Sequence, residues 1–305
     1  MSDIVCLGEP LAEFNDQGEG RWLYGFGGDV SNVAIAAARQ GASAGMIAHI
    51  GTDAFGDDLM RLWEREGVGA AHVARNRSAP TGIYFVHHDE GGHRFSYRRA
   101  GSAAALMTPQ DIPAEAIASA RILHLSGISL AISASACDAC FAAIAIAREA
   151  GTRVSIDTNL RTLLWPVERA RAIIHAAMAQ CDIALPGLDD ARQLCGLSDP
   201  AEIVAHYRGL GATTVALTLG DEGALIADGD ALHRLPPRPA HLVDASGAGD
   251  CFDGAFLARL TAGDDATAAA RYAIAAASLS VEGFGAIAPI PKAQAVRAAL
   301  AEPNT

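Results

Sequence analysis

Short apolar runs alternate with longer alanine-rich segments along this chain, and this alternation restricts the fold more than any other feature. Runs that are apolar throughout are typical of strands covered on both faces, as in a parallel sheet between layers of helices. Helical patterns follow most of these runs, so the sequence predicts an α/β fold with a mainly parallel central sheet. The expected strands lie at residues 4–9, 44–51, 121–127, 152–156, 181–185 and 215–220. The expected helices lie at residues 30–41, 55–66, 134–150, 251–259 and 266–281.

One segment breaks the alternation. Residues 81–87 and 92–99 both read as strands, and the glycines between them supply a turn with no intervening helix. Together with the aromatic stretch at 10–28, they predict a small β-sheet lid. We expect a single domain over residues 1–305, with the lid formed by about 10–28 and 80–102 inserted in it.

The second lid strand carries a tyrosine and two arginines close together. On a strand, Tyr97 and Arg99 share one face, while Arg98 points to the other. A tyrosine beside an arginine suits a polar, anionic substrate. A solvated strand face explains the same residues equally well.

Charge and composition exclude several classes of partner. The formal net charge of −12 and the pI near 5.2 argue against nucleic acid or an anionic membrane surface, because both require a concentrated basic face. No apolar run reaches the length of a spanning helix, and the acidic start of the chain lacks the basic region of a signal peptide. We therefore expect a cytoplasmic protein.

The cysteines and clustered histidines give weak signals for metal binding. Six cysteines are too few for a disulfide scaffold in 305 residues, so we expect reduced thiols. Cys137 and Cys140 form a C-x-x-C within a helical pattern, which favours packing over metal or redox chemistry. His87, His88 and His93 bracket a hairpin tip, which favours solvent exposure over metal binding.

A single lysine, Lys292, narrows the possible chemistry. No G-x-x-x-x-G-K-[ST] run exists, so a P-loop is excluded. Schiff-base catalysis by lysine is equally disfavoured. Arginine must supply any functional positive charge.

The loop Asp244-Ala245-Ser246-Gly247-Ala248-Gly249-Asp250 enters the helix at 251–259 and has little side-chain bulk. Free backbone N–H groups and the helix dipole make such a loop suitable for a phosphate or an oxyanion. Asp250 at its far edge can accept a proton from a substrate hydroxyl, which suggests phosphoryl transfer to an alcohol. A simple helix cap after a glycine turn is the alternative.

Other polar groups occupy positions where α/β proteins bind ligands. Gly28 and Asp29 precede the first helix and Asn32 lies in its first turn, where they line a pocket or merely cap the helix. Asp157, Asn159 and Arg161 follow a strand, and ligands collect outside the carboxyl ends of parallel strands. The turn containing Thr218, Gly220 and Gly223 either accepts a nucleotide or simply joins two strands.

The order of these motifs along the chain resembles that of the ribokinase-like (PfkB) family of carbohydrate kinases. The resemblance covers essentially the whole chain and rests on residues 27–32, on residues 51–56 and above all on Asp244–Asp250, which matches the D-x-x-G-A-G-D signature. It implies a three-layer α/β/α fold with a small β-sheet lid. It also implies an ATP-dependent kinase that uses Mg²⁺.

The resemblance assigns roles to the loop. Gly247, Ala248 and Gly249 would form the anion hole, and Asp250 would be the general base toward the sugar hydroxyl. A helix N-terminus lowers the pKa of a carboxylate, so we expect Asp250 to be a weak base that acts mainly through its position.

Further cofactor positions follow from the same resemblance. Thr218, Gly220 and Gly223, with Gly247 and Gly249, would bind the nucleotide. Asp244 and Ser246 match positions that can hold a monovalent cation such as K⁺. The family's N-x-x-E motif falls at residues 187–190, where Gly187 replaces the Asn and Asp190 replaces the Glu. Asp190 would help to organise Mg²⁺ indirectly, and the Gly187 departure puts the outer contacts of the metal in doubt.

Within the family, the chain most resembles 2-keto-3-deoxygluconate kinases. The predicted substrate-binding residues are Gly28, Asp29, Asn32, Tyr84, Tyr97, Arg99, Arg161 and Asp250. Guanidinium groups suit the carboxylate of a sugar acid, whereas a neutral sugar needs no arginine pair. A fructokinase or other neutral-sugar kinase is the alternative, and a non-catalytic sugar- or nucleotide-binding regulatory protein is a third. The resemblance also implies a homo-oligomer.

Overall fold

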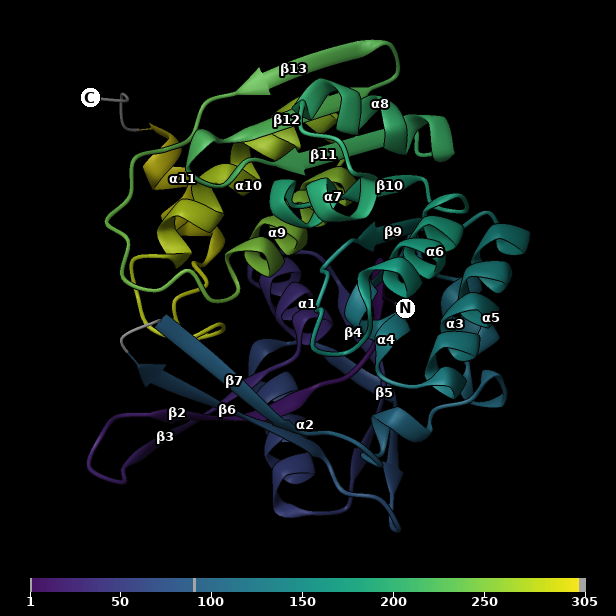
Figure 1. The fold of residues 1–305 in the computed structure, drawn as a ribbon, viewed down its shortest axis with the longest axis vertical. Helices are drawn as coiled ribbons and strands as arrows, with labels where there is room; N and C mark the ends of the chain where they lie inside the picture. Colours follow the sequence, from purple (N-terminus) through teal and green to yellow (C-terminus); the bar gives the residue numbers. More distant parts are fainter. Residues whose placement is uncertain (1, 90–91, 302–305) are drawn as a thin grey trace.

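A nine-stranded sheet runs through the computed structural model, which describes residues 2–89 and 92–301 (Figure 1). Its strand order is β13-β12-β11-β10-β9-β8-β1-β4-β5, and all the pairings from β11 to β5 are parallel. The strands are β1 (Ile4–Leu7), β4 (Ala44–Gly51), β5 (Gly69–Asn76), β8 (Ile122–Ser126), β9 (Arg153–Asp157), β10 (Ile183–Leu185), β11 (Thr214–Thr218), β12 (Ala224–Asp228) and β13 (Ala231–Leu235).

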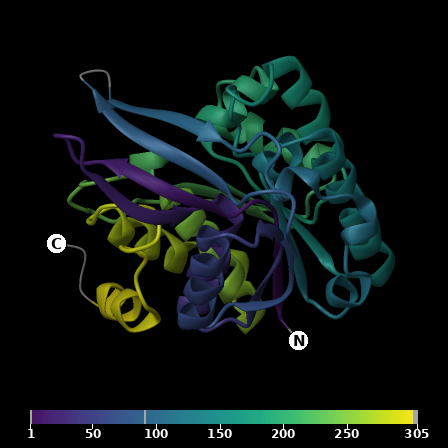
Figure 2. The ribbon, with the colours of Figure 1, turned by 90° about the horizontal axis from the view of Figure 1, so that it is seen from below.

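Helices cover both faces of this sheet (Figure 2). One layer contains α1 (Asp29–Arg39), α2 (Ala54–Glu66), α9 (Ala248–Ala262), α10 (Ala266–Ser280) and α11 (Ala293–Ala301). The other contains α3 (Ala114–Ala118), α4 (Gly127–Ala131), α5 (Ala134–Ala150), α6 (Val167–Met178), α7 (Leu188–Cys195) and α8 (Pro200–Leu210). Short 3₁₀ turns lie at Ala104–Leu106, Pro109–Asp111 and Gly220–Glu222. The expected three-layer α/β/α architecture is confirmed.

The central strands show why their sequences are apolar throughout. In β1, Ile4 and Cys6 pack into the core on the side of α1 and α9, while Val5 and Leu7 pack into the core on the side of α5 and α6. Alternating side chains of one strand therefore enter two separate cores. Both faces of the strand must be apolar.

A second sheet projects from one side of the molecule (Figure 1). It has the order β3-β2-β6-β7 and consists of two antiparallel pairs joined by parallel pairing of β2 with β6. The strands are β2 (Leu11–Asp16), β3 (Trp22–Gly27), β6 (Gly82–Asp89) and β7 (Gly92–Arg98). The small sheet expected from residues 10–28 and 80–102 is present, and the hairpin pairs as the sequence indicates.

Two strands at the edges of the large sheet escaped prediction. β5 and β13 are mostly exposed, and polar residues interrupt both, so neither produces the apolar run that reveals a buried strand. The turn that contains Thr218, Gly220 and Gly223 joins β11 to β12, and β12 pairs antiparallel with both of its neighbours. These additions extend the sheet without altering its centre.

The other structural expectations concern cysteines, histidines and membranes. All six cysteines are free thiols, and Cys137 and Cys140 pack within α5 against the core, as predicted. His88 is exposed and His87 half-buried, whereas the side chain of His93 lies outside the described residues. No helix in residues 2–89 and 92–301 is long and apolar enough to cross a membrane.

Candidate active site

The small-residue loop ends where α9 begins. Gly247 is the N-cap of α9 with φ 73°, a conformation that favours glycine. A side chain at this position would also collide with the backbone oxygen of Ala286, only 2.8 Å from an ideal Cβ. The loop therefore needs glycine for both reasons, and the first turn of α9 presents its backbone N–H groups to the adjoining space.

Asp250 lies in that first turn and is almost completely buried, with 9% exposure. Its Oδ2 accepts a hydrogen bond of 2.7 Å from the Nδ2 of Asn32 in α1. Burial and, secondarily, the negative charge of Asp29 raise the pKa of Asp250 to about 7, against the opposing effects of Asn32 and Arg161. The expected depression of its pKa by the helix N-terminus is thus wrong, because loss of hydration outweighs the helix dipole.

The Gly28-Asp29 turn brings a second acid to the same place. Gly28 has φ 99°, and a Cβ there would lie 2.4 Å from the backbone oxygen of Glu9, so only glycine fits this approach. The Oδ2 of Asp29 accepts hydrogen bonds from Ser126 and, at 3.0 Å, from Asn159. The Oδ1 atoms of Asp29 and Asn32 are buried without a hydrogen-bond partner in the described structure. Such atoms are suited to ligand hydroxyl groups.

A cavity of about 220 Å³ lies between the loop and the carboxyl ends of the strands. Burial, with repulsion from neighbouring carboxylates, raises the pKa of both Asp157 and Asp253 well above the ordinary value. The Oδ2 of Asp253 has no hydrogen-bond partner in the described structure. The lining residues are Asp157, Asn159, Arg161, Leu185, Gly187, Asp190, Thr218, Ala245, Gly247, Ala248, Gly249, Asp250 and Asp253.

A larger cavity of about 550 Å³ adjoins the first, and the two share Thr218, Ala245, Ala248 and Gly249. Gly220 and Gly223 line it from the turn after β11, while Phe252, Ile274 and Val281 provide apolar walls. A volume of this order holds a small organic ligand or nucleotide. The loop before α9 therefore lies between a large, partly apolar site and a small, acidic one.

Comparison with known proteins shows the family to which this chain belongs. The model of the pfkB family carbohydrate kinases matches residues 1–293. The chain belongs to the PfkB family of carbohydrate kinases. This membership confirms the activity class that the loop motif indicated, a kinase acting on a carbohydrate.

Individual PfkB relatives cover nearly the whole chain. A 2-dehydro-3-deoxygluconokinase from Thermoproteus tenax is 35% identical over 96% of this chain and 93% of its own length. The crystal structure of a PfkB protein from Polaromonas sp. JS666 matches with a TM-score of 0.90 and 30% identity over 98% of this chain and 100% of that one. The structure of a fructokinase with bound ATP from Xylella fastidiosa matches with a TM-score of 0.90 and 25% identity over 98% of each chain.

The predicted sugar-binding residues of this PfkB kinase occupy two different settings. Tyr84 is buried, donates a hydrogen bond to Glu13, and has its ring stacked on that of Tyr97 with centroids 5.9 Å apart. Arg99 is 8% exposed and pairs with Glu9, which is 1% exposed. Arg161 lines the small cavity beside Asp250. Arg99 is paired with the buried carboxylate of Glu9. Arg161 is therefore the arginine that lines the small cavity.

The predicted metal-organising residues are also brought to the loop. The Oδ2 of Asp190, near the start of α7, accepts a 2.8 Å hydrogen bond from the backbone N–H of Leu160, and the side chain lines the small cavity. Asp244 accepts backbone hydrogen bonds from Ser246 at 2.8 Å and Gly285 at 2.9 Å. The Asp244 carboxylate therefore ties the loop to a later segment of the kinase.

Sequence reasoning missed two acids of this kinase that had detectable signals. Asp253 follows Asp250 by three residues on a predicted helix, so helical spacing places both on one face. Glu9 follows the first buried strand and was counted as part of its apolar run. The apolar walls Ile274 and Val281 had no comparable signal, since they join the site only through the packing of α10 beside α9.

Proposed function

We propose that this protein is an ATP-dependent 2-keto-3-deoxygluconate kinase. The observation that carries the proposal is a single guanidinium, that of Arg161, in the same small cavity as the buried Asp250. The cavity thus offers one group that pairs with a carboxylate and one that accepts a proton from a hydroxyl. The similarity to the Thermoproteus tenax enzyme supports the same substrate.

In this proposal the nucleotide occupies the larger cavity and the sugar acid occupies the smaller one. The shared residues Thr218, Ala248 and Gly249 then lie where the γ-phosphoryl group meets the sugar. Asp250 accepts the proton of the attacking hydroxyl as the new O–P bond forms and the bond to the departing ADP oxygen breaks. Backbone N–H groups at the start of α9 stabilise the charge on the transferring group.

Acidic groups in the cavity fit a divalent cation. Asp253 has a buried carboxylate oxygen without a partner in the described chain, and Asp190 lines the same cavity. These two residues would hold Mg²⁺, directly or through water. The ion would neutralise charge on the phosphate oxygens. A monovalent cation such as K⁺ at Asp244 and Ser246 stays a prediction.

The second sheet is proposed to act as a lid. Tyr84 and Tyr97 lie on its inner side, and Tyr97 is close enough to Arg161 for the arginine charge to lower the tyrosine pKa against the stronger effect of burial. Closure of this sheet over the sugar would exclude water as a competing phosphoryl acceptor. The opposite side carries Trp22 and Tyr24, both partly exposed, and we propose that this aromatic surface supports self-association.

A substrate panel tests the proposed specificity. In a coupled ADP-release assay, kcat/KM for 2-keto-3-deoxygluconate is expected to exceed that for fructose or ribose by about 10- to 100-fold, because a carboxylate paired with arginine contributes about 1.5–3 kcal/mol. A higher kcat/KM for a neutral sugar would overturn the substrate assignment.

One observation favours a neutral-sugar kinase as the second candidate. Glu9 neutralises Arg99, which leaves one arginine rather than a pair at the sugar cavity. The same substrate panel separates the two candidates. A non-catalytic regulatory role is disfavoured because Asp250 and the glycine loop are both in place; ATP binding without turnover on any tested sugar would favour it.

The raised pKa of Asp250 predicts an acid limb in the pH profile. With its pKa at about 7, the carboxylate is protonated below that pH and cannot accept the hydroxyl proton. We expect kcat/KM to rise with pH up to about 7 and then level off. In the variant Asn32→Ala, the limb should move to higher pH because a hydrogen bond that favours the carboxylate is lost. An acid limb near pH 4 in the wild type would contradict the assignment.

A further inference from the structure

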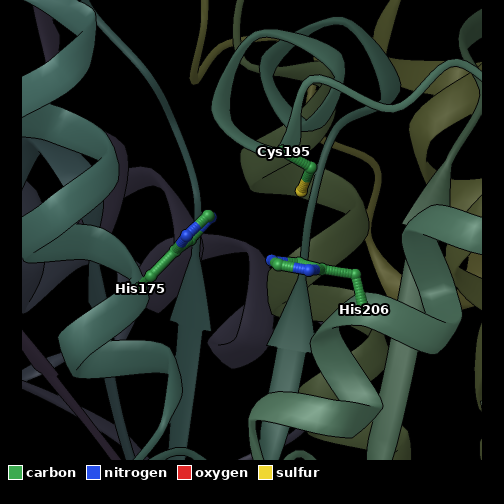
Figure 3. Close-up of side chains that lie close together, drawn as sticks. All are labelled: His175, Cys195 and His206. Carbon is green, nitrogen blue, oxygen red and sulfur yellow. The ribbon is translucent and has the colours of Figure 1, made fainter.

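Three side chains with metal-binding atoms converge away from the two cavities. His175 comes from α6, Cys195 is the last residue of α7, and His206 comes from α8 (Figure 3). One ligand atom from each side chain lies within 4.8 Å of the others. None of the three lines either cavity. The phosphoryl-transfer chemistry therefore leaves this cluster unexplained.

The two histidines have unused ring nitrogens. The Nε2 atoms of His175 and His206 are both buried, and neither has a hydrogen-bond partner within the described residues. The ring centroids lie 4.9 Å apart with the rings tilted by 56°, so the pair is not a parallel stack. Buried polar atoms normally find a partner, so two unpaired nitrogens on neighbouring rings require an explanation.

We propose that His175, Cys195 and His206 form a transition-metal site that takes Zn²⁺ or a similar thiophilic divalent ion. Two imidazoles and one thiolate are a ligand set for such ions, whereas Mg²⁺ and Ca²⁺ prefer oxygen. Metal distances of about 2.0 Å to nitrogen and about 2.3 Å to sulfur place tetrahedral ligands roughly 3.3–3.5 Å apart. Rotation of the three side chains would have to close the remaining separation. Water supplies the fourth ligand.

The electrostatic setting of the two histidines agrees with this site. Burial lowers the pKa of His175 to about 4 and also lowers that of His206, so both rings are neutral and free to coordinate at neutral pH. Burial raises the pKa of Cys195 above its ordinary value, and the opposing effects of Tyr207 and Arg171 are smaller, so the thiol carries its proton before metal binds. Binding therefore releases one proton from the thiol to solvent as the S–metal bond forms.

The site would tie together three helices of one layer. α7 carries Asp190 near its first turn and Cys195 at its end, so a metal at Cys195 restrains the helix that contributes Asp190 to the small cavity. Because the metal binds the folded chain, it adds to thermal stability. The expected rise in the unfolding midpoint is about 5 °C at a free Zn²⁺ concentration 100-fold above Kd.

Cobalt provides a direct test on the intact protein. Titration of the metal-free, reduced protein with Co²⁺ should produce a thiolate-to-cobalt charge-transfer band with one equivalent bound, and Zn²⁺ should remove it. The variants Cys195→Ser and His206→Ala should lose the band and the thermal shift. The variants Cys137→Ser and His233→Ala should retain both, because they remove a half-buried thiol of α5 and an exposed histidine of β13 outside the cluster.

The outcomes distinguish this site from the proposed kinase site. A cobalt band that persists in Cys195→Ser, or no band and no thermal shift in the wild type, overturns the metal proposal. Circular dichroism on each variant checks that lost binding is not lost folding. Because the readout is metal binding, the result does not depend on which sugar the enzyme phosphorylates.

Discussion

Replacing Asp250 by Asn is expected to lower kcat by about 10²–10⁴-fold while the protein stays folded. Asn keeps the size of the side chain and can still contact Asn32, but it cannot accept a proton from the sugar hydroxyl. Steady-state ADP release and circular dichroism measure the two effects. KM for ATP should change little, because the nucleotide lies mainly in the larger cavity in our proposal.

The same substitution should stabilise the fold at alkaline pH. The folded-state pKa of Asp250 is raised to about 7, so the charged form destabilises the folded state above that pH. The free energy of unfolding of Asp250→Asn should exceed that of the wild type by about 1–3 kcal/mol at pH 8. The difference should shrink as the pH falls from about 7 toward the ordinary carboxyl value of 3.8, where both states bind the proton.

Asp253→Asn is the matched control for the loss of turnover. It removes a second buried carboxylate one turn away on α9. Since we assign Asp253 to Mg²⁺, this variant should keep measurable turnover and require more Mg²⁺ for half-maximal rate. Near-native kcat in Asp250→Asn, or equal losses in both variants at saturating Mg²⁺, would sink the assignment of Asp250 as the base.

The position of the loop before α9 could be predicted, but its electrostatics could not. Small residues before a helix and polar residues after a strand are local patterns, and they indicated Asp250, Asp29 and Arg161. The pKa of Asp250 depends on burial by chain far away in sequence and on Asp29, which lies on a different helix. The local sequence pattern therefore predicted a lowered pKa for Asp250, whereas burial in the folded protein raises it.

The arginines show the same division between local and long-range information. Alternation along β7 correctly paired Tyr97 with Arg99, whose guanidinium lies 5.3 Å from the tyrosine ring centroid. The partner that takes Arg99 is Glu9, ninety residues earlier, hidden at the end of a buried strand. A strand pattern states which face a side chain is on, but it does not state which buried charge it meets there. We therefore assign recognition of the substrate carboxylate to Arg161 alone, in place of the predicted pair of arginines.

Arg161→Ala is expected to lower kcat/KM for 2-keto-3-deoxygluconate by about 10- to 100-fold, the loss of one charge-assisted pair. Arg161 is exposed at the cavity, and Asp250 keeps its hydrogen bond from Asn32 when the arginine is removed, so the variant should stay folded. Both sugars are compared at a pH well above the acid limb, because loss of Arg161 also raises the pKa of Asp250. For fructose, kcat/KM at that pH should fall by less than about threefold, because no carboxylate is present to lose its partner. For Arg161→Lys, kcat/KM for 2-keto-3-deoxygluconate should lie between the values of the wild type and of Arg161→Ala, because lysine keeps the charge but lacks the planar guanidinium.

Arg98→Ala is the matched control for this specificity change. Arg98 is also exposed and adjoins Tyr97, but its guanidinium donates to the backbone oxygen of Tyr97 instead of lining the cavity. Its removal should leave the preference for the sugar acid over fructose unchanged. Equal losses for both sugars in Arg161→Ala would mean that the arginine acts on the transferring phosphoryl group. The carboxylate of the sugar acid would then need a different partner, and the neutral-sugar kinase would become the better reading of the site.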